Sequence, residues 1–595
     1  ITPRGRSCPS QCSTVSTLTE GNPLLGQEPL IGSDANFGGS SFVEAERLWS
    51  ISFPMVLSSI SGYVMSLSSL VILGKYAGPE DLAGASLGTT FSNVCGCSML
   101  VGFSEAIDTL CSQAYGQKNL KRIGRILQRG VVLLLVCATV SSLLCWFSED
   151  LLIQLGQNPR LAKTAASYVR YQIPGLYGYA ICMAMQRYLT AQEISRPLFV
   201  VAAGALPIHI AITYILVETF SLGQRGAAIA WSASFVGRAV VLVSYTSLLE
   251  SRRSEAEKTW SGFDMVTAFQ KWDTLLAVSL PAFAMLATEW WTFEILTLMS
   301  GLLPNPETQV IANTICSNVI GFMFMFHLGI SIAVCVRVGA ALGAYRTDCI
   351  KRTITSSFVI CILQWAVVGG ILITPYVRSH LSLLFAPPLK GHEKQSQDIR
   401  ELVDLCLIYV VIQQFFDGIK EVCNGVIRGC GRQLVGMETS FVAYFVVCLP
   451  LGYALAFQKY QSWAPGVPGL FIAIIVASSL HAVLNGTVVL GTDWKKQTAK
   501  VNAETSRQHS FIVSPDAPVE HYSTFHSPES QPKSVTGMGT ELSRTLSHHS
   551  HVSHGKGRAM TPTRGSPMLF TPIPNIPPPL LKLPSGGTTV HRFPL

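Results

Sequence analysis

The middle of this 595-residue chain contains twelve apolar stretches, each long enough to cross a membrane as a helix. A hydrocarbon core of about 30 Å requires about 20 consecutive apolar residues in helical form. Charged residues make up only 13% of the chain, whereas about a quarter is usual in soluble domains. We therefore predict an all-α polytopic membrane protein. The expected spans lie near residues 49–74, 82–107, 124–147, 164–187, 198–218, 226–248, 273–301, 309–335, 354–376, 402–425, 437–457 and 467–490.

Short motifs recur in the two halves of this series of spans. Ser92-Asn93-Val94 is found again as Ser317-Asn318-Val319, and Leu206-Pro207 is found again as Leu449-Pro450. Since six spans separate the two copies of each motif, both halves cross the membrane in the same orientation. The repeat predicts two six-helix lobes that are related by an axis along the membrane normal, with a central cavity between them.

Lys and Arg are concentrated in the connections that follow the even-numbered spans. By the positive-inside rule, these connections and both ends of the chain are cytosolic. The ends are polar, and the first one lacks the apolar core of a secretory signal. We predict a disordered cytosolic tail at 1–44, the N-lobe at 45–250, a cytosolic inter-lobe linker at 251–272, the C-lobe at 273–494, and a disordered basic cytosolic tail at 495–595.

The tails and the cysteines bear on location and partners. The formal charge of +8 comes largely from the C-terminal tail, which suits an anionic membrane surface, so we expect a lipid bilayer and no nucleic acid as partner. Glu20-Gly-Asn-Pro-Leu24-Leu25 has the form of an acidic dileucine sorting signal, and both the plasma membrane and the vacuolar membrane stay open as locations. The 16 cysteines lie mostly singly in apolar spans, where they act as small apolar side chains. We expect no metal, no cofactor and a monomer.

The seventh expected span carries two carboxylates at membrane depth, Glu289 and Glu294. An acid there costs about 2.5–3.5 kcal/mol on insertion scales, so it usually faces water, a partner or a proton route. Five positions correspond to about 140° around a helix, so the two side chains do not point along one line. These residues predict a proton and substrate site. Trp290 and Trp291 beside them can stack on a flat organic cation, or they can serve packing alone. The alternative is that Thr288 or Thr292 satisfies the carboxylates, which then only hold helices together.

Further polar residues in the spans extend this candidate site. Asp417 is a second isolated acid, and Gln413 lies one helical turn before it, in position for a hydrogen bond. Asp108 lies near the cytosolic end of the second span, where a helix-end hydrogen bond and a functional role are both open. His327 can relay protons, or it can be a buried histidine that its neighbours satisfy.

A series of motifs from about residue 45 to residue 495 matches, in order, the motifs of one transporter family. The motifs are Leu82-Ala-Gly-Ala-Ser-Leu87, Asp108-Thr-Leu-Cys-Ser-Gln-Ala-Tyr-Gly116, Gly156-Gln-Asn-Pro159, Ile173-Pro-Gly-Leu176, Glu289-Trp-Trp-Thr-Phe-Glu294, Ser300-Gly-Leu-Leu-Pro-Asn-Pro306, Arg337-Val-Gly-Ala-Ala-Leu-Gly-Ala344 and Arg428-Gly-Cys-Gly-Arg-Gln433. Each motif alone is common, but the ordered set is specific. The chain resembles the multidrug and toxic compound extrusion (MATE) family of the eukaryotic type, and its long tails suggest a fungal source.

This resemblance implies a V-shaped two-lobe transporter that exchanges protons, or sodium in some bacterial members, for organic compounds. Glu289 falls on the family's helix-seven acid, Glu294 on its companion, and Asp417 on its helix-ten acid. Asn318 stands where some animal members carry a glutamate, so this chain lacks one cavity charge. His327 replaces the family's helix-eight proline. The first span lacks the acid of some prokaryotic members, so the resemblance gives no support to an ion site in the first lobe.

Together these observations predict a secondary active antiporter, not an enzyme, that exports or sequesters organic and often cationic compounds in exchange for protons. Alternating access of the two lobes carries the exchange in this prediction. A sodium-coupled antiporter of the same fold and a lipid-linked flippase of a related fold are the alternatives. The predicted proton and substrate site consists of Glu289, Glu294, Asp417, Gln413, Asn318, Trp290 and Asn93, with Asp108 and His327 as secondary candidates.

Overall fold

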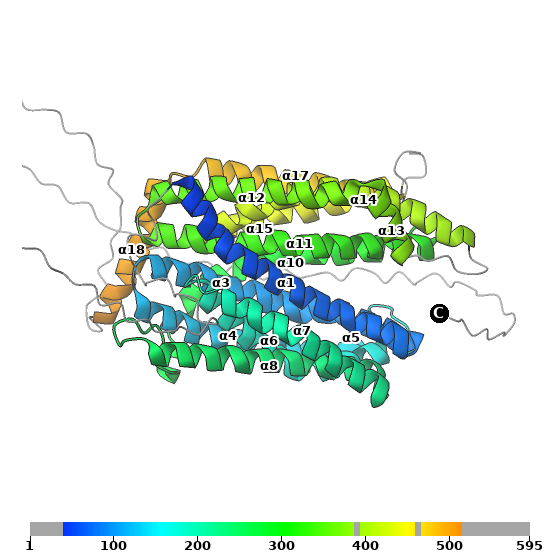
Figure 1. Cartoon of the computed structure of the whole chain (residues 1–595), viewed down its shortest axis with the longest axis horizontal. Helices are drawn as coiled ribbons and strands as arrows, with labels where there is room; N and C mark the ends of the chain where they lie inside the picture. The colour runs from blue at the N-terminus through cyan, green and yellow to red at the C-terminus, as the bar shows by residue number, and fades with distance from the viewer. Residues whose placement is uncertain (1–39, 386–392, 458–465, 514–595) are drawn as a thin grey trace, which may run out of the picture. The chain divides into compact units, whose positions relative to one another are not determined.

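The computed structural model describes residues 40–385, 393–457 and 466–513, which form helices and their connections and contain no strand. Figure 1 shows two groups of long helices, one coloured from blue to blue-green and the other from green to orange. The first group, the N-lobe, consists of α1 (Ser41–Tyr76), α2 (Pro79–Ser92), η2 (Asn93–Cys97), α3 (Ser98–Gly116), α4 (Leu120–Trp146), α5 (Ser148–Gln154), α6 (Pro159–Thr190), α7 (Arg196–Tyr214), η3 (Ile215–Thr219) and α8 (Gly223–Arg252).

The second group, the C-lobe, follows the short helix α9 (Met265–Ala268). It consists of α10 (Trp272–Ser300), α11 (Pro306–Gly343), α12 (Thr347–Ile373), α13 (Pro375–Phe385), α14 (Glu393–Gly429), α15 (Gln433–Phe441), η4 (Val442–Cys448), α16 (Leu449–Phe457) and α17 (Val467–Leu490). A last helix, α18 (Trp494–Val513), comes after it. The segments η2, η3 and η4 are π-helical turns that continue the helices before them.

Among the described residues, eleven helices are long and apolar enough to cross a membrane. Each overlaps one expected span, although several helices extend up to nine residues beyond the expected end. The remaining expected span, 164–187, lies in α6, whose 32 residues correspond to about 48 Å of helix. This helix is less apolar because Arg170, Gln172, Gln186 and Arg187 interrupt it. The prediction of an all-helical polytopic membrane protein is confirmed.

Glycines in α6 allow a close approach of α8 inside the N-lobe. A Cβ atom at Gly175 would lie 2.6 Å from the ring of Trp231, and one at Gly178 would lie 2.7 Å from the backbone nitrogen of Val236. Small residues permit such contacts between membrane helices, where packing replaces the hydrophobic effect as the source of attraction. The close packing fixes the middle of α8 against the interior of the N-lobe.

Glycines also bring the two lobes together at the end of the bundle that carries the Lys- and Arg-rich connections, which we call the basic end. A Cβ atom at Gly116, the last residue of α3, would overlap the carbonyl oxygen of Ala340 in α11. A Cβ atom at Gly343 of α11 would likewise overlap the carbonyl oxygen of Gln113 in α3. At these positions α3 and α11 are therefore in backbone contact.

Hydrogen bonds and an ion pair between α3 and the end of α14 add to this contact. Thr109 Oγ1 donates to the carbonyl oxygen of Arg428 at 2.9 Å, and Gln113 Nε2 donates to that of Gly429 at 3.0 Å. The side chain of Arg428 pairs with Glu105, and both groups are buried. Separation of the lobes at this end would break this pair and leave both charges without a partner, so the pair favours the closed arrangement.

The first residues of α1 belong to the folded bundle, so the predicted boundary of the disordered N-terminal tail at residue 44 is wrong. Glu44 is buried and accepts hydrogen bonds from Arg337 of α11, at 2.9 Å from Nε and 2.7 Å from Nη2. Arg337 also pairs with Glu193, at 2.5 Å. A fully buried arginine needs such partners. The polar sequence around Glu44 does not indicate that Glu44 is one of them.

The predicted start of the disordered C-terminal tail at residue 495 is also wrong, since α18 is helical as far as Val513. Asn502 of α18 donates to the carbonyl oxygen of Leu342 in the C-lobe at 3.0 Å and accepts from Gln117 Nε2, just after α3, at 3.0 Å. The helix therefore contacts both lobes at the basic end. The rest of both tails, including the dileucine-like segment, lies outside the described residues.

We expect Glu44→Gln to lower the free energy of unfolding by about 2 kcal/mol, because it removes one of two carboxylates paired with a fully buried arginine. Unfolding of the purified protein by SDS in mild detergent measures this change. Glu46→Gln is the matched control, since Glu46 lies on the same helix and is exposed. If the two variants unfold alike, Glu193 alone is enough to satisfy Arg337.

Candidate functional site

A cluster of four charged side chains is buried inside the C-lobe, and we call it the C-lobe acid cluster. Lys420 of α14 lies at its centre and is fully buried. Its ammonium group pairs with Glu289 of α10, lies 2.9 Å from Asp417 Oδ1, and lies 3.3 Å from Glu421 Oε1. The three carboxyl residues are each less than a tenth exposed. The predicted pair Glu289 and Asp417 is thus brought together, with one lysine between them.

Neighbouring polar groups hold this cluster in place. Asp417 accepts a hydrogen bond from Gln413 Nε2 at 3.2 Å, as the helical spacing predicted. The other oxygen of Asp417 lies 3.3 Å from Nδ1 of His327 on α11. Lys420 also donates to the hydroxyl of Tyr444 at 3.4 Å. His327, a secondary candidate from the sequence, therefore lies beside the cluster.

Lys420 and Glu421 complete this site but are absent from the residues predicted from the sequence, where Asp417 is an isolated acid. The signal was present in α14. Asp417, Lys420, Glu421, Asn424 and Arg428 recur at three- and four-residue steps, which places them on one face of a helix. Such a stripe inside an apolar span predicts a buried network, and Asn424 Nδ2 does donate to Glu421 Oε1 at 2.9 Å.

Glu294 does not belong to the cluster. It is partly exposed, and its carboxyl group interacts with the side chain of Thr90 on α2 of the N-lobe. The two acids of α10 therefore face different surroundings, as their angular separation predicted. The alternative in which Thr288 or Thr292 satisfies Glu289 is wrong, because both hydroxyls donate to carbonyl oxygens four residues earlier on α10.

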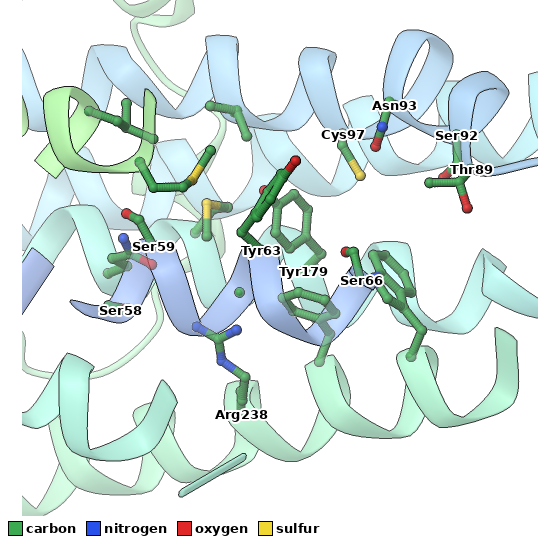
Figure 2. A pocket seen from close by; sticks show the side chains of 18 of the residues that line it. Ser58, Ser59, Tyr63, Ser66, Thr89, Ser92, Asn93, Cys97, Tyr179 and Arg238 are labelled. Carbon is green, nitrogen blue, oxygen red and sulfur yellow. The ribbon is translucent and has the colours of Figure 1, made fainter. Parts of the chain in front are cut away.

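A second polar region is a cavity of about 220 Å³ in the N-lobe, which we call the N-lobe cavity. Figure 2 shows that its walls carry Ser58, Ser59 and Tyr63 on one side and Thr89, Ser92 and Asn93 on another. The wall that comes from the C-lobe consists of Trp290, Met325, Leu328 and Ile332. Two of the predicted site residues, Asn93 and Trp290, therefore line the N-lobe cavity and lie outside the C-lobe acid cluster.

The last two predicted residues have partners of their own. Asn318 accepts hydrogen bonds from the hydroxyl of Tyr63, at 3.0 Å to its carbonyl oxygen and 3.4 Å to its side-chain oxygen. Asp108 pairs with Arg187 of α6 at 2.5 Å, and Arg187 Nε donates to Ser104 Oγ at 3.1 Å. The buried pair of Asp108 and Arg187 is neutral overall, so Asp108 contributes no net charge to the N-lobe.

Two lobes of membrane-spanning helices, with buried charges inside one and a polar cavity inside the other, are typical of a membrane transporter. The family model MatE matches residues 54–215 and 281–454. Protein DETOXIFICATION 1 of Arabidopsis thaliana is 32% identical over 483 residues, which is 80% of this chain and 96% of the relative. Protein DETOXIFICATION 3 of the same plant is 31% identical over 486 residues, with 80% and 96% covered. The chain belongs to the MATE family.

Solved structures support the same fold. The crystal structure of the eukaryotic MATE transporter AtDTX14 superposes with a TM-score of 0.71 at 29% identity, covering 78% of this chain and 99% of that one. An outward-facing MATE transporter of the MOP superfamily superposes with a TM-score of 0.67 at 14% identity, covering 79% of this chain and 98% of that one. At this low identity, the match supports the fold and nothing further. The predicted two-lobe MATE-type fold is confirmed, whereas the orientation of the termini and the fungal source stay predictions.

Proposed function

We propose that this transporter is an antiporter that exports or sequesters organic compounds in exchange for protons. The observation that carries the proposal is the C-lobe acid cluster, in which three carboxyl groups share the single ammonium group of Lys420. If all were ionised, two negative charges would remain uncompensated among buried side chains. Burying charge without compensation costs several kcal/mol, so the cluster favours the uptake of protons or of a cation.

Competition for this surplus charge is the physical basis of exchange in the proposal. A proton on Glu289 removes the charge that attracts a cationic compound, and the bound compound in turn disfavours the proton. Each ligand therefore weakens the binding of the other by the same factor, as linkage requires. A membrane carrier with this property uses a proton gradient to release its compound on the acidic side.

Helix α14 gives the cluster a physical connection to the contact between the lobes. The carbonyl oxygen of Glu421 accepts from Ser331 Oγ at 2.7 Å, and Ser331 Oγ accepts from Arg428 Nη2 at 2.6 Å. Arg428 also pairs with Glu105 of the N-lobe. A change in charge at Glu289 or Asp417 thus acts on the same helix that holds the lobes together, which supports alternating access as the transport cycle.

We expect Gly116→Ala to reduce transport at least tenfold while binding of the compound is retained. The new methyl group would overlap the carbonyl oxygen of Ala340, and overpacking of this kind costs about 1–3 kcal/mol, here only when the basic end is closed. Uptake into vesicles measures transport, and equilibrium binding is measured on the same preparation. Gly204→Ala is the control, because no atom of the described residues lies within 4 Å of the added Cβ there. Full transport by Gly116→Ala would exclude closure at this contact as a step of the cycle.

The coupling ion is tested with purified protein in sealed vesicles that contain a pH-sensitive dye. We expect members of a panel of organic compounds to provoke proton flux in the opposite direction, with no requirement for sodium. Empty vesicles and vesicles made permeable to protons serve as controls. Flux that appears only with a sodium gradient would leave the fold as it is and replace protons by sodium as the coupling ion.

A further inference from the structure

Arg238 lies near the middle of α8 and is only 6% exposed. The middle of a spanning helix is the most apolar depth of the membrane, where an arginine is costly unless it has a partner or faces a polar cavity. Arg238 lines the N-lobe cavity, and Figure 2 shows its side chain extending from α8 into that space toward the helix that carries Ser58 and Ser59.

No acid neutralises Arg238 among the residues that the structure describes. Its Nε atom is buried and has no hydrogen-bond partner, and its guanidinium group lies 5.1 Å from the ring centroid of Phe235. A ring face attracts the cation but offers no oxygen for its hydrogen-bond donors. The other arginine of the cavity wall, Arg187, is neutralised by Asp108. The N-lobe cavity therefore carries one uncompensated positive charge.

The rest of the wall suits a small molecule with an apolar ring. Among the residues that the structure describes, no Asp or Glu lines the cavity, and aromatic side chains pack beside Arg238. The ring centroid of Phe235 lies 4.6 Å from that of Trp231 and 4.9 Å from that of Tyr179. The volume of about 220 Å³ is below the range of about 300–1,000 Å³ typical for drug-sized ligands, so the occupant is small.

We propose that the N-lobe cavity binds a small aromatic carboxylic acid, with its carboxylate on Arg238 and its ring against Trp231 and Phe235. Guanidinium and carboxylate form paired, charge-assisted hydrogen bonds, which the present neighbours of Arg238 do not provide. The site is separate from the C-lobe acid cluster and has the opposite charge. Binding of the aromatic acid to this cavity is measured at equilibrium, without an ion gradient. The proposal therefore does not depend on which ion drives transport.

Equilibrium binding to the full chain tests the proposal, with the protein at pH 7 in nanodiscs of neutral phosphatidylcholine. The probes are 4-hydroxyphenylacetate, its amide and tyramine, which share a ring and differ in charge. Quenching of tryptophan fluorescence reports binding, since Trp231 and Trp290 line the cavity. We expect the acid to bind at least tenfold more tightly than either the amide or the amine.

Variants then assign this preference to Arg238. Arg238→Gln is expected to abolish the preference for the acid, and Arg238→Lys is expected to keep part of it. Arg225→Gln is the matched control, because Arg225 is an exposed arginine near the start of α8 and outside this cavity. If Arg238→Gln fails to fold, the comparison of acid with amide on the unchanged protein and the Arg238→Lys variant still decide the question.

Three results would overturn the proposal. The first is equal affinity for acid and amide in the unchanged protein, and the second is an undiminished preference for the acid in Arg238→Gln. The third is displacement of the acid when phosphatidylglycerol is added to the nanodiscs, since the cavity would then hold a lipid phosphate. Because no gradient is present, none of these results bears on proton coupling, and loss of proton flux in vesicles would not bear on this site.

Discussion

Glu289→Gln is expected to reduce proton-coupled transport by at least 100-fold and to leave the protein folded in the membrane. The change keeps the shape of the side chain but removes a group that can accept a proton. Lys420 keeps two carboxylates within 3.3 Å, those of Asp417 and Glu421, so it is not left without a partner. The variant therefore loses the exchangeable charge while the buried cation stays compensated.

Internal pH of vesicles and uptake of a substrate measure this loss, and gel filtration with a thermal unfolding midpoint confirms folding. Glu218→Gln is the control, because Glu218 is an exposed carboxyl group at the end of a spanning helix and away from the cluster. Undiminished proton exchange by Glu289→Gln would show that Glu289 is not the coupling residue. Asp417 would then be the next acid of the cluster to test as the proton carrier.

Lys420→Met is expected to be the most destabilising single change in the C-lobe. It leaves Glu289, Asp417 and Glu421 buried without the cation that all three contact. Removing one partner of a buried pair typically costs about 3–5 kcal/mol, because the charge that remains is uncompensated. Resistance to unfolding by SDS in detergent measures the effect, and Lys163→Met, at an exposed position of α6, is the control.

The double variant Lys420→Met with Asp417→Asn separates charge from packing. If repulsion among carboxylates causes the loss, neutralising one of them restores part of the stability, and the two changes are not additive. If the double variant is no more stable than Lys420→Met alone, the lost contacts of the lysine side chain with its neighbours are responsible, and the cluster carries less charge than we propose.

Much of the fold was predictable because membrane insertion leaves a strong pattern in a sequence. Runs of apolar residues located all twelve expected spans, and eleven of the described helices are apolar enough to cross a membrane. The helix at 164–187, α6, is less apolar, in part because Arg187 pairs with Asp108 and donates to Ser104 inside the N-lobe. The contact of Gln413 with Asp417 also followed from helical spacing. In both cases the relevant information is local in the chain.

The parts that were missed depend on contacts between distant segments. Nothing near Glu44 indicates that it pairs with Arg337, 293 residues away. Lys420 is absent from the residues predicted from the sequence, although its spacing from Asp417 is visible there. Only the fold shows that Glu289 of α10 lies beside the same lysine. The N-lobe cavity is built by side chains from both lobes, and no single stretch of sequence shows that Arg238 lacks an acid to pair with.

The backbone contact between α3 and α11 has a consequence for genetics. Random mutagenesis that selects for loss of transport, while requiring normal protein levels, should return changes at Gly116 and Gly343 more often than at glycines with open space around them. Such alleles differ from those at charged positions, since the binding chemistry is intact and only the movement of the halves is obstructed. Cells that carry them would make normal amounts of a protein that still binds the compound but does not move it across the membrane.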